Sequence, residues 1–175
     1  MTTEVSRRAR QIRLALFDVD GVMTDGALFI SESGESFKAF SILDGLGLKL
    51  LKSSGVSTGI LTGRSSAPVK TRARELAIDH LIQGAEDKLQ AFSRLRALLG
   101  LDESQICYMG DDLPDLPVLR RCGLAIVPPN AVQQVREQAH IITRSRAGSG
   151  AVREACELIM QAQGTWEAQI GSFLS

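Results

Sequence analysis

The sequence predicts an α/β fold, in which helices cover both faces of a doubly wound and mostly parallel sheet. The first observation is that six short apolar runs alternate with amphipathic stretches along the 175 residues, as strands and helices do in such folds. The second is the composition, with 44% hydrophobic and 23% charged residues, which is that of an ordinary globular domain. A chain of this length fits one domain, so residues 1–175 are expected to form a single unit.

The six apolar runs are the expected strands of the sheet. They cover residues 14–17, 56–61, 80–83, 106–109, 124–127 and 141–143. Between them, apolar residues recur at helical spacing, as in the face formed by Leu89, Phe92, Leu95 and Leu99. Helices are therefore expected from about residue 44, over about 66–76, around 89–99, and over about 113–122, 130–139 and 150–163. Ligands of such sheets bind beyond the carboxyl ends of the strands, so chemistry is expected just after each apolar run.

One segment interrupts this alternation. Leu28, Phe29 and Ile30 are followed by the turn sequence Ser-Glu-Ser-Gly and then by residues 35–40, which is typical of a β-hairpin. The hairpin, over about residues 28–40, is too short to be a domain. The tail over about residues 164–175 shows no clear pattern and is expected to be flexible.

Charge and cysteine content narrow the class of protein. Twenty Lys and Arg balance twenty Asp and Glu, so the sequence lacks the basic bias of a dedicated nucleic-acid binder. No apolar run approaches the ~18 residues of a membrane span. Three separated cysteines without a C-x-x-C pair indicate neither a disulfide framework nor a zinc site. The expected setting is the reducing cytoplasm, with no nucleic acid and no membrane as partner.

Two carboxylates directly follow the first expected strand. The strand ends in Asp18-Val19-Asp20-Gly21, and side chains two residues apart in an extended segment point the same way. Close carboxylates repel, which raises one pKa or recruits a cation. Oxygen ligands without His or Cys suit Mg²⁺. The alternative is a simple Asp-Gly turn that Asp18 caps.

Groups that suit a phosphate follow later strands. Thr62, Gly63 and Arg64 offer a hydroxyl, an open backbone amide and a guanidinium after the second run. Lys88 stands at the start of an expected helix, where a cation is unfavourable unless an anion binds there. Taken singly, these signals also fit an ordinary loop and a solvated lysine.

Three acids end the fourth expected strand. Asp111, Asp112 and Asp115 lie within five residues at a strand-to-helix junction, and helix capping explains one of them but not three. All four motifs fall at the same expected edge of the sheet, in the order acids, hydroxyl, lysine, acids. Jointly they indicate a site far more strongly than any one motif does.

This ordered set resembles the haloacid dehalogenase superfamily of phosphatases. The patterns D-x-D-G-x-x-T-D, T-G-R, K and G-D-D-x-x-D all match in order. Phe40, Asp44-Gly45-Leu46-Gly47, Gln83-Gly84 and residues 150–154 further resemble the phosphatases of 3-deoxy-D-manno-octulosonate 8-phosphate, over about residues 14–163. The resemblance implies a Mg²⁺-dependent enzyme that releases phosphate and the free sugar acid during the synthesis of lipopolysaccharide precursors.

The resemblance also implies roles for the acidic residues. Asp18 would attack phosphorus and form an aspartyl-phosphate, while Asp20 would protonate the leaving group and later activate water. Spacing alone does not say which of the two attacks. The Asp18 carboxylate, the Asp20 backbone carbonyl and Asp111 would hold Mg²⁺.

The remaining motif residues would act on the phosphoryl group. Thr62 and Lys88 would grip its oxygens in the transition state. Asp112 and Asp115 would orient Lys88 or the waters on the metal.

The spacing of the motifs leaves no room for a cap domain over the site. One hairpin, one helix and one strand fill the stretch from Asp20 to Thr62, and one helix and one strand fill that from Thr62 to Lys88. The resembled family closes its sites by forming homotetramers, in which hairpins cover neighbouring subunits. The phosphorylated sugar acid would then be bound by Asp20, Ser41, Ile42, Leu43, Asp44, Gly45, Lys49, Arg64, Arg72 and Lys88.

The chain departs from the family pattern at positions expected to touch the substrate. Leu43 stands where the family usually has a basic residue, and Lys49 where Arg is common. Residues 147–150 read Ala-Gly-Ser-Gly in place of Gly-Gly-Arg-Gly. A phosphatase of a related sugar acid, such as a nonulosonate phosphate, would carry nearly the same motifs.

Two alternatives belong to other functional classes. A two-component receiver domain has its adjacent acids after the first strand and a lone acceptor Asp after the third, whereas here the adjacent pair Asp111-Asp112 comes late. A catalytically inactive scaffold of the same fold is disfavoured by the full set of motif residues.

Overall fold

A six-stranded parallel sheet forms the centre of the molecule. In the computed structural model, which describes residues 2–32, 34–171 and 173, the strand order is β5-β4-β1-β6-β7-β8. The strands are β1 (Leu14–Phe17), β4 (Ser57–Leu61), β5 (His80–Ile82), β6 (Ile106–Met109), β7 (Leu124–Val127) and β8 (Ile141–Ile142). Every pairing in this sheet is parallel. The predicted doubly wound α/β fold is confirmed.

The chain changes direction across the sheet at β1. It adds β4 and β5 on one side of β1 and then returns to add β6, β7 and β8 on the other. Phe17 at the end of β1 is paired with Met109 at the end of β6, and the next residue, Asp18, donates its backbone N–H to the Met109 carbonyl at 2.9 Å. The two acidic motifs therefore start side by side at a topological switch point, where such sheets bind ligands.

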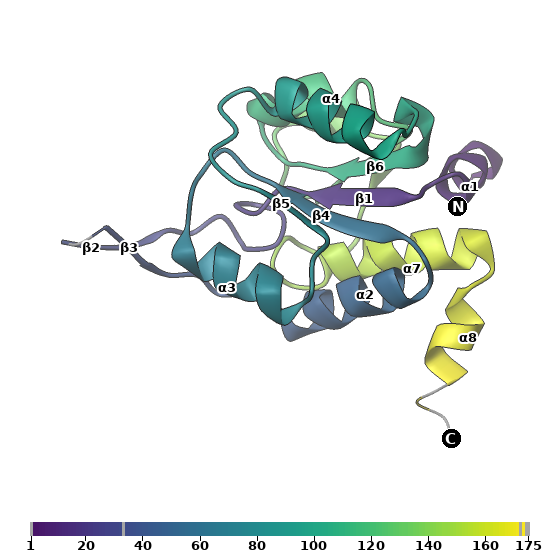
Figure 1. The fold of residues 1–175 in the computed structure, drawn as a ribbon, viewed down its shortest axis with the longest axis horizontal. Helices are drawn as coiled ribbons and strands as arrows, with labels where there is room; N and C mark the ends of the chain where they lie inside the picture. The colour runs from purple at the N-terminus through teal and green to yellow at the C-terminus, as the bar shows by residue number, and fades with distance from the viewer. Residues whose placement is uncertain (1, 33, 172, 174–175) are drawn as a thin grey trace.

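Helices cover both faces of the sheet (Figure 1). One face carries α1 (Thr3–Arg10), α2 (Ile42–Ser53), α3 (Ala67–Glu75) and α7 (Ala151–Gln163), and the other carries α4 (Lys88–Leu99), α5 (Leu116–Leu119) and α6 (Gln133–Arg136). Two 3₁₀ turns, η1 (Glu103–Gln105) and η2 (Leu113–Asp115), flank β6. Strand β1 supplies both cores, since Ala15 and Phe17 face the first layer and Leu14 and Leu16 the second.

Two helices differ from their expected lengths, one because prolines interrupt it and the other because a turn precedes it. The stretch expected as one helix over 113–122 is divided into η2 and α5, each with a proline in its first turn. Helix α6 begins only at Gln133, after Pro128 and Pro129 and a turn in which Ala131 is buried.

Two further helices were not expected from the sequence. The side chain of Thr2 caps α1, and Val5 and Ala9 on its inner face are buried. The tail expected to be flexible contains α8 (Trp166–Gly171), where the indole of Trp166 lies 5.4 Å from the guanidinium carbon of Arg153 on α7. None of the helices in the described ranges has the length and apolar character of a membrane span.

The predicted hairpin is confirmed as β2 (Phe29–Ser31) and β3 (Gly34–Phe37), which pair antiparallel. It projects away from the body of the molecule (Figure 1). The rings of Phe29 and Phe37 stack at 4.4 Å. Phe29, Ile30 and Phe37 are nevertheless exposed, so this arm carries apolar surface into solvent.

Candidate active site

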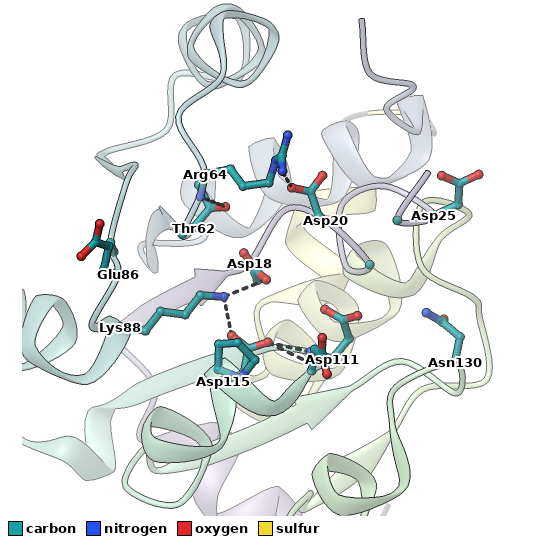
Figure 2. Close-up of a pocket in the computed structure, with 16 residues that line it drawn as sticks. Asp18, Asp20, Asp25, Thr62, Arg64, Glu86, Lys88, Asp111, Asp115 and Asn130 are labelled. Carbon is teal, nitrogen blue, oxygen red and sulfur yellow. Dashed lines mark hydrogen bonds and ion pairs between the residues drawn. The ribbon is translucent and has the colours of Figure 1, made fainter. Parts of the chain in front are cut away.

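The four sequence motifs meet in one cavity of about 470 Å³ at the carboxyl edge of the sheet (Figure 2). Its lining includes Asp18, Asp20, Thr62, Arg64, Lys88, Asp111, Asp112 and Asp115. Asp25, Glu86 and Asn130 also line it, and the sequence motifs did not single out the last two. The strand order explains the convergence, because these residues follow neighbouring strands or begin the next helix.

Lys88 reaches from the start of α4 to two carboxylates. Its Nζ lies 2.8 Å from Asp18 Oδ2 and 2.6 Å from Asp115 Oδ1, as Figure 2 shows. Burial lowers the pKa of Lys88, but the charges of Asp18 and Asp115 outweigh it and the net pKa is raised. The ammonium is therefore held charged in a buried position, which accounts for a lysine at a helix N-terminus.

Asp115 accepts hydrogen bonds from several parts of the site. Its Oδ1 accepts hydrogen bonds from Lys88 Nζ and from the Tyr108 hydroxyl at 2.5 Å. Its Oδ2 accepts from the backbone N–H groups of Asp111 at 3.0 Å and Asp112 at 3.2 Å. Asp115 thus ties the loop that carries Asp111 to the lysine beside Asp18. No sequence motif marked the Tyr108 hydroxyl, and the available signal was a tyrosine in an expected buried strand, where its polar group needs a partner.

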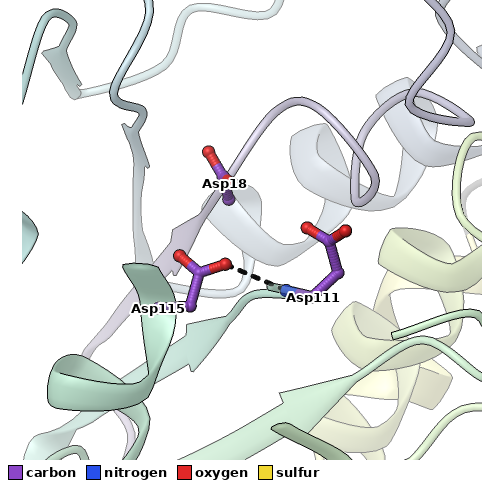
Figure 3. A group of neighbouring side chains, drawn as sticks. All are labelled: Asp18, Asp111 and Asp115. Carbon is purple, nitrogen blue, oxygen red and sulfur yellow. Dashed lines mark hydrogen bonds between the residues drawn. The ribbon is translucent and has the colours of Figure 1, made fainter. Parts of the chain in front are cut away.

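Three of the carboxylates that line the cavity lie close together (Figure 3). Oxygens of Asp18, Asp111 and Asp115 lie within 4.8 Å of one another. Burial, followed by the charge of Asp115, raises the pKa of Asp18 to about 6. Burial, followed by the charges of Asp115 and Asp18, raises the pKa of Asp111 to about 7. The group has more negative charge than Lys88 offsets, so it favours a cation.

The residues present fit a Mg²⁺ ion. Among the described residues, Oδ1 of Asp18 and Oδ1 of Asp111 are buried and have no hydrogen-bond partner, whereas both oxygens of Asp115 accept hydrogen bonds. Gly21, with φ of +83°, keeps this space open, since a Cβ there would come within 2.0 Å of Asp111 Oδ2. Asp18 and Asp111 therefore each have a side-chain oxygen that can bind a hard cation.

Asp20 lines the same cavity but is not part of this group of three carboxylates, although the sequence suggested that it converges with Asp18. Its Oδ1 lies 2.5 Å from Lys38 Nζ, and its Oδ2 lies 3.7 Å from Arg64 Nε. Lys38 comes from the end of the hairpin and was not identified from the sequence. No motif marked it, because a lone lysine after a strand is ordinarily solvated.

Several residues expected around the sugar acid do not line the cavity. Asp44 is buried, and its carboxylate accepts the backbone N–H groups of Gly150 and Arg153 at the start of α7. Arg72 donates to the Ser41 carbonyl at 3.0 Å and pairs with Glu75 at 2.9 Å.

The other members of that set lie on or beside α2. Gly45 is buried so close to Arg72 that a Cβ would come within 2.4 Å of its Nη2. Ile42, Leu43 and Lys49 are exposed on the surface. Within one chain, Asp20, Arg64 and Lys88 are the members of the expected substrate set that line the cavity.

Comparisons with known proteins agree with this geometry. Residues 80–155 match the haloacid dehalogenase-like hydrolases, which is the class that the parallel sheet and its acidic edge define. The 3-deoxy-D-manno-octulosonate 8-phosphate phosphatase of Yersinia pestis is 43% identical over 96% of this chain and 90% of its own length. That of Escherichia coli K12 is 40% identical over 94% of this chain and 87% of its own.

A solved structure gives the same result. The 3-deoxy-D-manno-octulosonate 8-phosphate phosphatase of Moraxella catarrhalis, in complex with magnesium, phosphate and KDO, superposes with a TM-score of 0.95 at 46% identity, covering 99% of each chain. The chain therefore belongs to the family of 3-deoxy-D-manno-octulosonate 8-phosphate phosphatases, as its motifs predicted.

Proposed function

We propose that this protein is a Mg²⁺-dependent phosphatase that hydrolyses 3-deoxy-D-manno-octulosonate 8-phosphate, in the synthesis of lipopolysaccharide precursors. The observation that carries the proposal is the buried Asp18 carboxylate beside Asp111: Lys88 pairs with one of its oxygens, and the other has no partner in the part of the chain that the structure describes. Relatives named as 3-deoxy-D-manno-octulosonate 8-phosphate phosphatases align with nearly the whole chain. The magnesium, phosphate and KDO in the Moraxella catarrhalis complex support both the cofactor and the substrate class.

The reaction proceeds in two displacements. Asp18 attacks phosphorus, the bond to the sugar oxygen breaks, and that oxygen receives a proton from Asp20. Asp20 then takes a proton from water, which attacks the aspartyl-phosphate and releases phosphate and free Asp18. Lys88 and Thr62 hold the phosphoryl oxygens, and Asp115 fixes Lys88.

Asp18, the backbone carbonyl of Asp20, and Asp111 would hold the Mg²⁺ ion. When bound, the ion offsets the repulsion between the anionic nucleophile and the phosphate dianion. Asp112, whose side chain caps the η2 turn, would orient waters beside it. Arg64, at the mouth of the cavity, would bind the carboxylate of the sugar acid.

We further propose that residues 1–175 form a single domain that works as a homo-oligomer, most simply a tetramer as in the resembled family. The exposed apolar side chains of the hairpin support this, because such surface marks protein–protein contacts. In such an assembly the exposed Ile42, Leu43 and Lys49 would face a neighbour's substrate. The proposed location is the cytoplasm, which the three free and buried cysteines suit.

The test is phosphate release from a panel of esters after metal removal and readdition of Mg²⁺. We expect the octulosonate 8-phosphate to give the highest kcat/KM, above a nonulosonate phosphate and far above hexose phosphates. A preference for the nine-carbon acid would reassign the substrate, and absence of turnover with every ester would refute the phosphatase assignment.

A further inference from the structure

Lys38 has a buried side chain at the end of an arm whose apolar residues are exposed. It directly follows β3, and its neighbour Phe37 is 57% exposed. The Lys38 side chain is only 1% exposed and places Nζ 2.5 Å from Asp20 Oδ1. Burying an ammonium is costly unless a carboxylate compensates it, so this contact is a specific feature of how the hairpin meets the body.

The contact joins the hairpin to the loop that carries the proposed acid and base. Asp20 lies two residues beyond Asp18, and next to Gly21, whose positive φ bends the loop. Lys38 holds Oδ1 of Asp20, which leaves Oδ2 directed toward Arg64 and the cavity. A carboxylate that must pass a proton to a leaving oxygen has to be held in one orientation.

We propose that Lys38 is a positioning residue that fixes the Asp20 carboxylate for proton transfer and, through the same ion pair, holds the hairpin against the catalytic loop. The role in proton transfer rests on the proposed function, whereas the role in holding the hairpin does not. In the first displacement the proton leaves Asp20 for the sugar oxygen, and Lys38 keeps its own protons throughout. The hairpin thus contributes to chemistry as well as to the proposed subunit contact.

The first test compares phosphate esters of graded leaving-group basicity, including small alkyl and aryl esters that do not need sugar contacts. An alkyl leaving group requires the proton from Asp20, whereas a weakly basic aryl leaving group does not. Lys38→Met should lower kcat for alkyl esters at least tenfold, with a much smaller effect on aryl esters and on KM. Lys38→Arg should restore part of the alkyl rate. The matched control is Lys52→Met, which removes a lysine paired with Asp79 outside the cavity.

The second test does not depend on turnover. Hydrogen–deuterium exchange of the hairpin amides should become several-fold faster in Lys38→Met, and equally so in Asp20→Asn, because either change removes the pair. Lys52→Met should leave hairpin exchange unchanged. An equal loss of kcat across all leaving groups overturns the role in proton transfer, and unchanged exchange in both variants overturns the coupling. If the wild-type protein hydrolysed no ester, the proposed function would fail, while the exchange result would still decide the Lys38–Asp20 contact.

Discussion

The ammonium group of Lys88 lies 2.8 Å from Oδ2 of Asp18, and the exposed fractions of the two residues are only 6% and 7%. The pair lies where the first strand ends and α4 begins, so regular elements position both the proposed nucleophile and the lysine proposed to hold the phosphoryl oxygens. Because Oδ1 of Asp18 has no partner within residues 2–32, 34–171 and 173, the lysine orients this carboxylate and leaves one of its oxygens open.

Replacing Asp18 with Asn should abolish turnover without unfolding the protein. An amide is a poor nucleophile and a poor Mg²⁺ ligand, so we expect kcat to fall by about 10³-fold or more. Burial already disfavours the charge of Asp18, whose pKa is raised to about 6, so the unfolding temperature should not drop. Steady-state kinetics and circular dichroism check both points, and more than a tenth of the wild-type rate would refute the assignment.

Tyr108→Phe should show whether the Tyr108 hydroxyl contributes to catalysis, by holding Asp115, or only to stability. The variant removes the hydroxyl that donates to Asp115 Oδ1 and leaves Lys88 as the partner of that oxygen. Losing a hydrogen bond to a carboxylate should lower the free energy of unfolding by about 1–3 kcal/mol. Looser placement of Lys88 should reduce kcat about tenfold, with little change in KM. A destabilised variant with unchanged kcat would show that the hydroxyl serves stability alone.

Mg²⁺ should support activity and Ca²⁺ should inhibit it. Both ions take oxygen ligands, but Ca²⁺ accepts six to eight, often from bidentate carboxylates. A Ca²⁺ ion bound to both oxygens of Asp18 would leave neither of them available to attack phosphorus. Phosphate release after chelation and readdition of each ion measures this, and equal rates with the two ions would contradict it.

Sequence patterns located most of the sheet because each strand is a short apolar run that ends at polar residues, glycine or proline. They missed α1, because only Val5 and Ala9 on its buried face are apolar and the rest of the helix is rich in arginine. Thr2 is nevertheless a recognisable N-cap. They overextended α6 because the buried turn at Ala131 resembles helical sequence. Such boundaries depend on tertiary packing, which periodicity does not record.

The cavity was predictable where a motif ends a strand and unpredictable where a contact joins distant segments. Asp18, Thr62 and Asp111 could be placed together because neighbouring parallel strands end at one edge. Lys38 could not, since its ion pair depends on where the end of the hairpin lies relative to the loop that carries Asp20. Asp44 belongs to a family motif and was expected to bind the substrate, yet its carboxylate accepts a hydrogen bond from the start of α7.

Asp44 should therefore govern stability through α7, with a defined dependence on pH. Burial raises the pKa of Asp44 despite hydrogen bonds from the backbone of α7, so the folded protein holds this proton more tightly than the unfolded chain. Stability from Asp44 thus increases as pH falls through its raised pKa, and the charged form is the less favourable one at pH 7.

Asp44→Asn keeps an acceptor for the Arg153 N–H and removes the charge. Its free energy of unfolding at pH 7 should equal or exceed that of the wild type, and the difference should shrink as pH is lowered. Asp44→Ala leaves the α7 amides without an acceptor and should cost about 1–2 kcal/mol. Urea denaturation at several pH values checks this, and an Asn variant as unstable as the Ala variant at pH 7 would rule it out.

The hairpin should decide the size of the assembly. Phe29, Ile30 and Phe37 are 41%, 69% and 57% exposed, and an isolated two-stranded hairpin is at best marginally stable in water. A short Gly/Ser turn in place of residues 28–40 should therefore give smaller species in sedimentation. It should also weaken turnover of the octulosonate phosphate more than turnover of a small generic ester, because a neighbour's surface would no longer cover the sugar. Lys38→Met is the matched control, since it removes the Asp20 contact and keeps the apolar side chains. A truncated protein that sediments like the parent, with unchanged selectivity, would show that the hairpin does not close a neighbouring site.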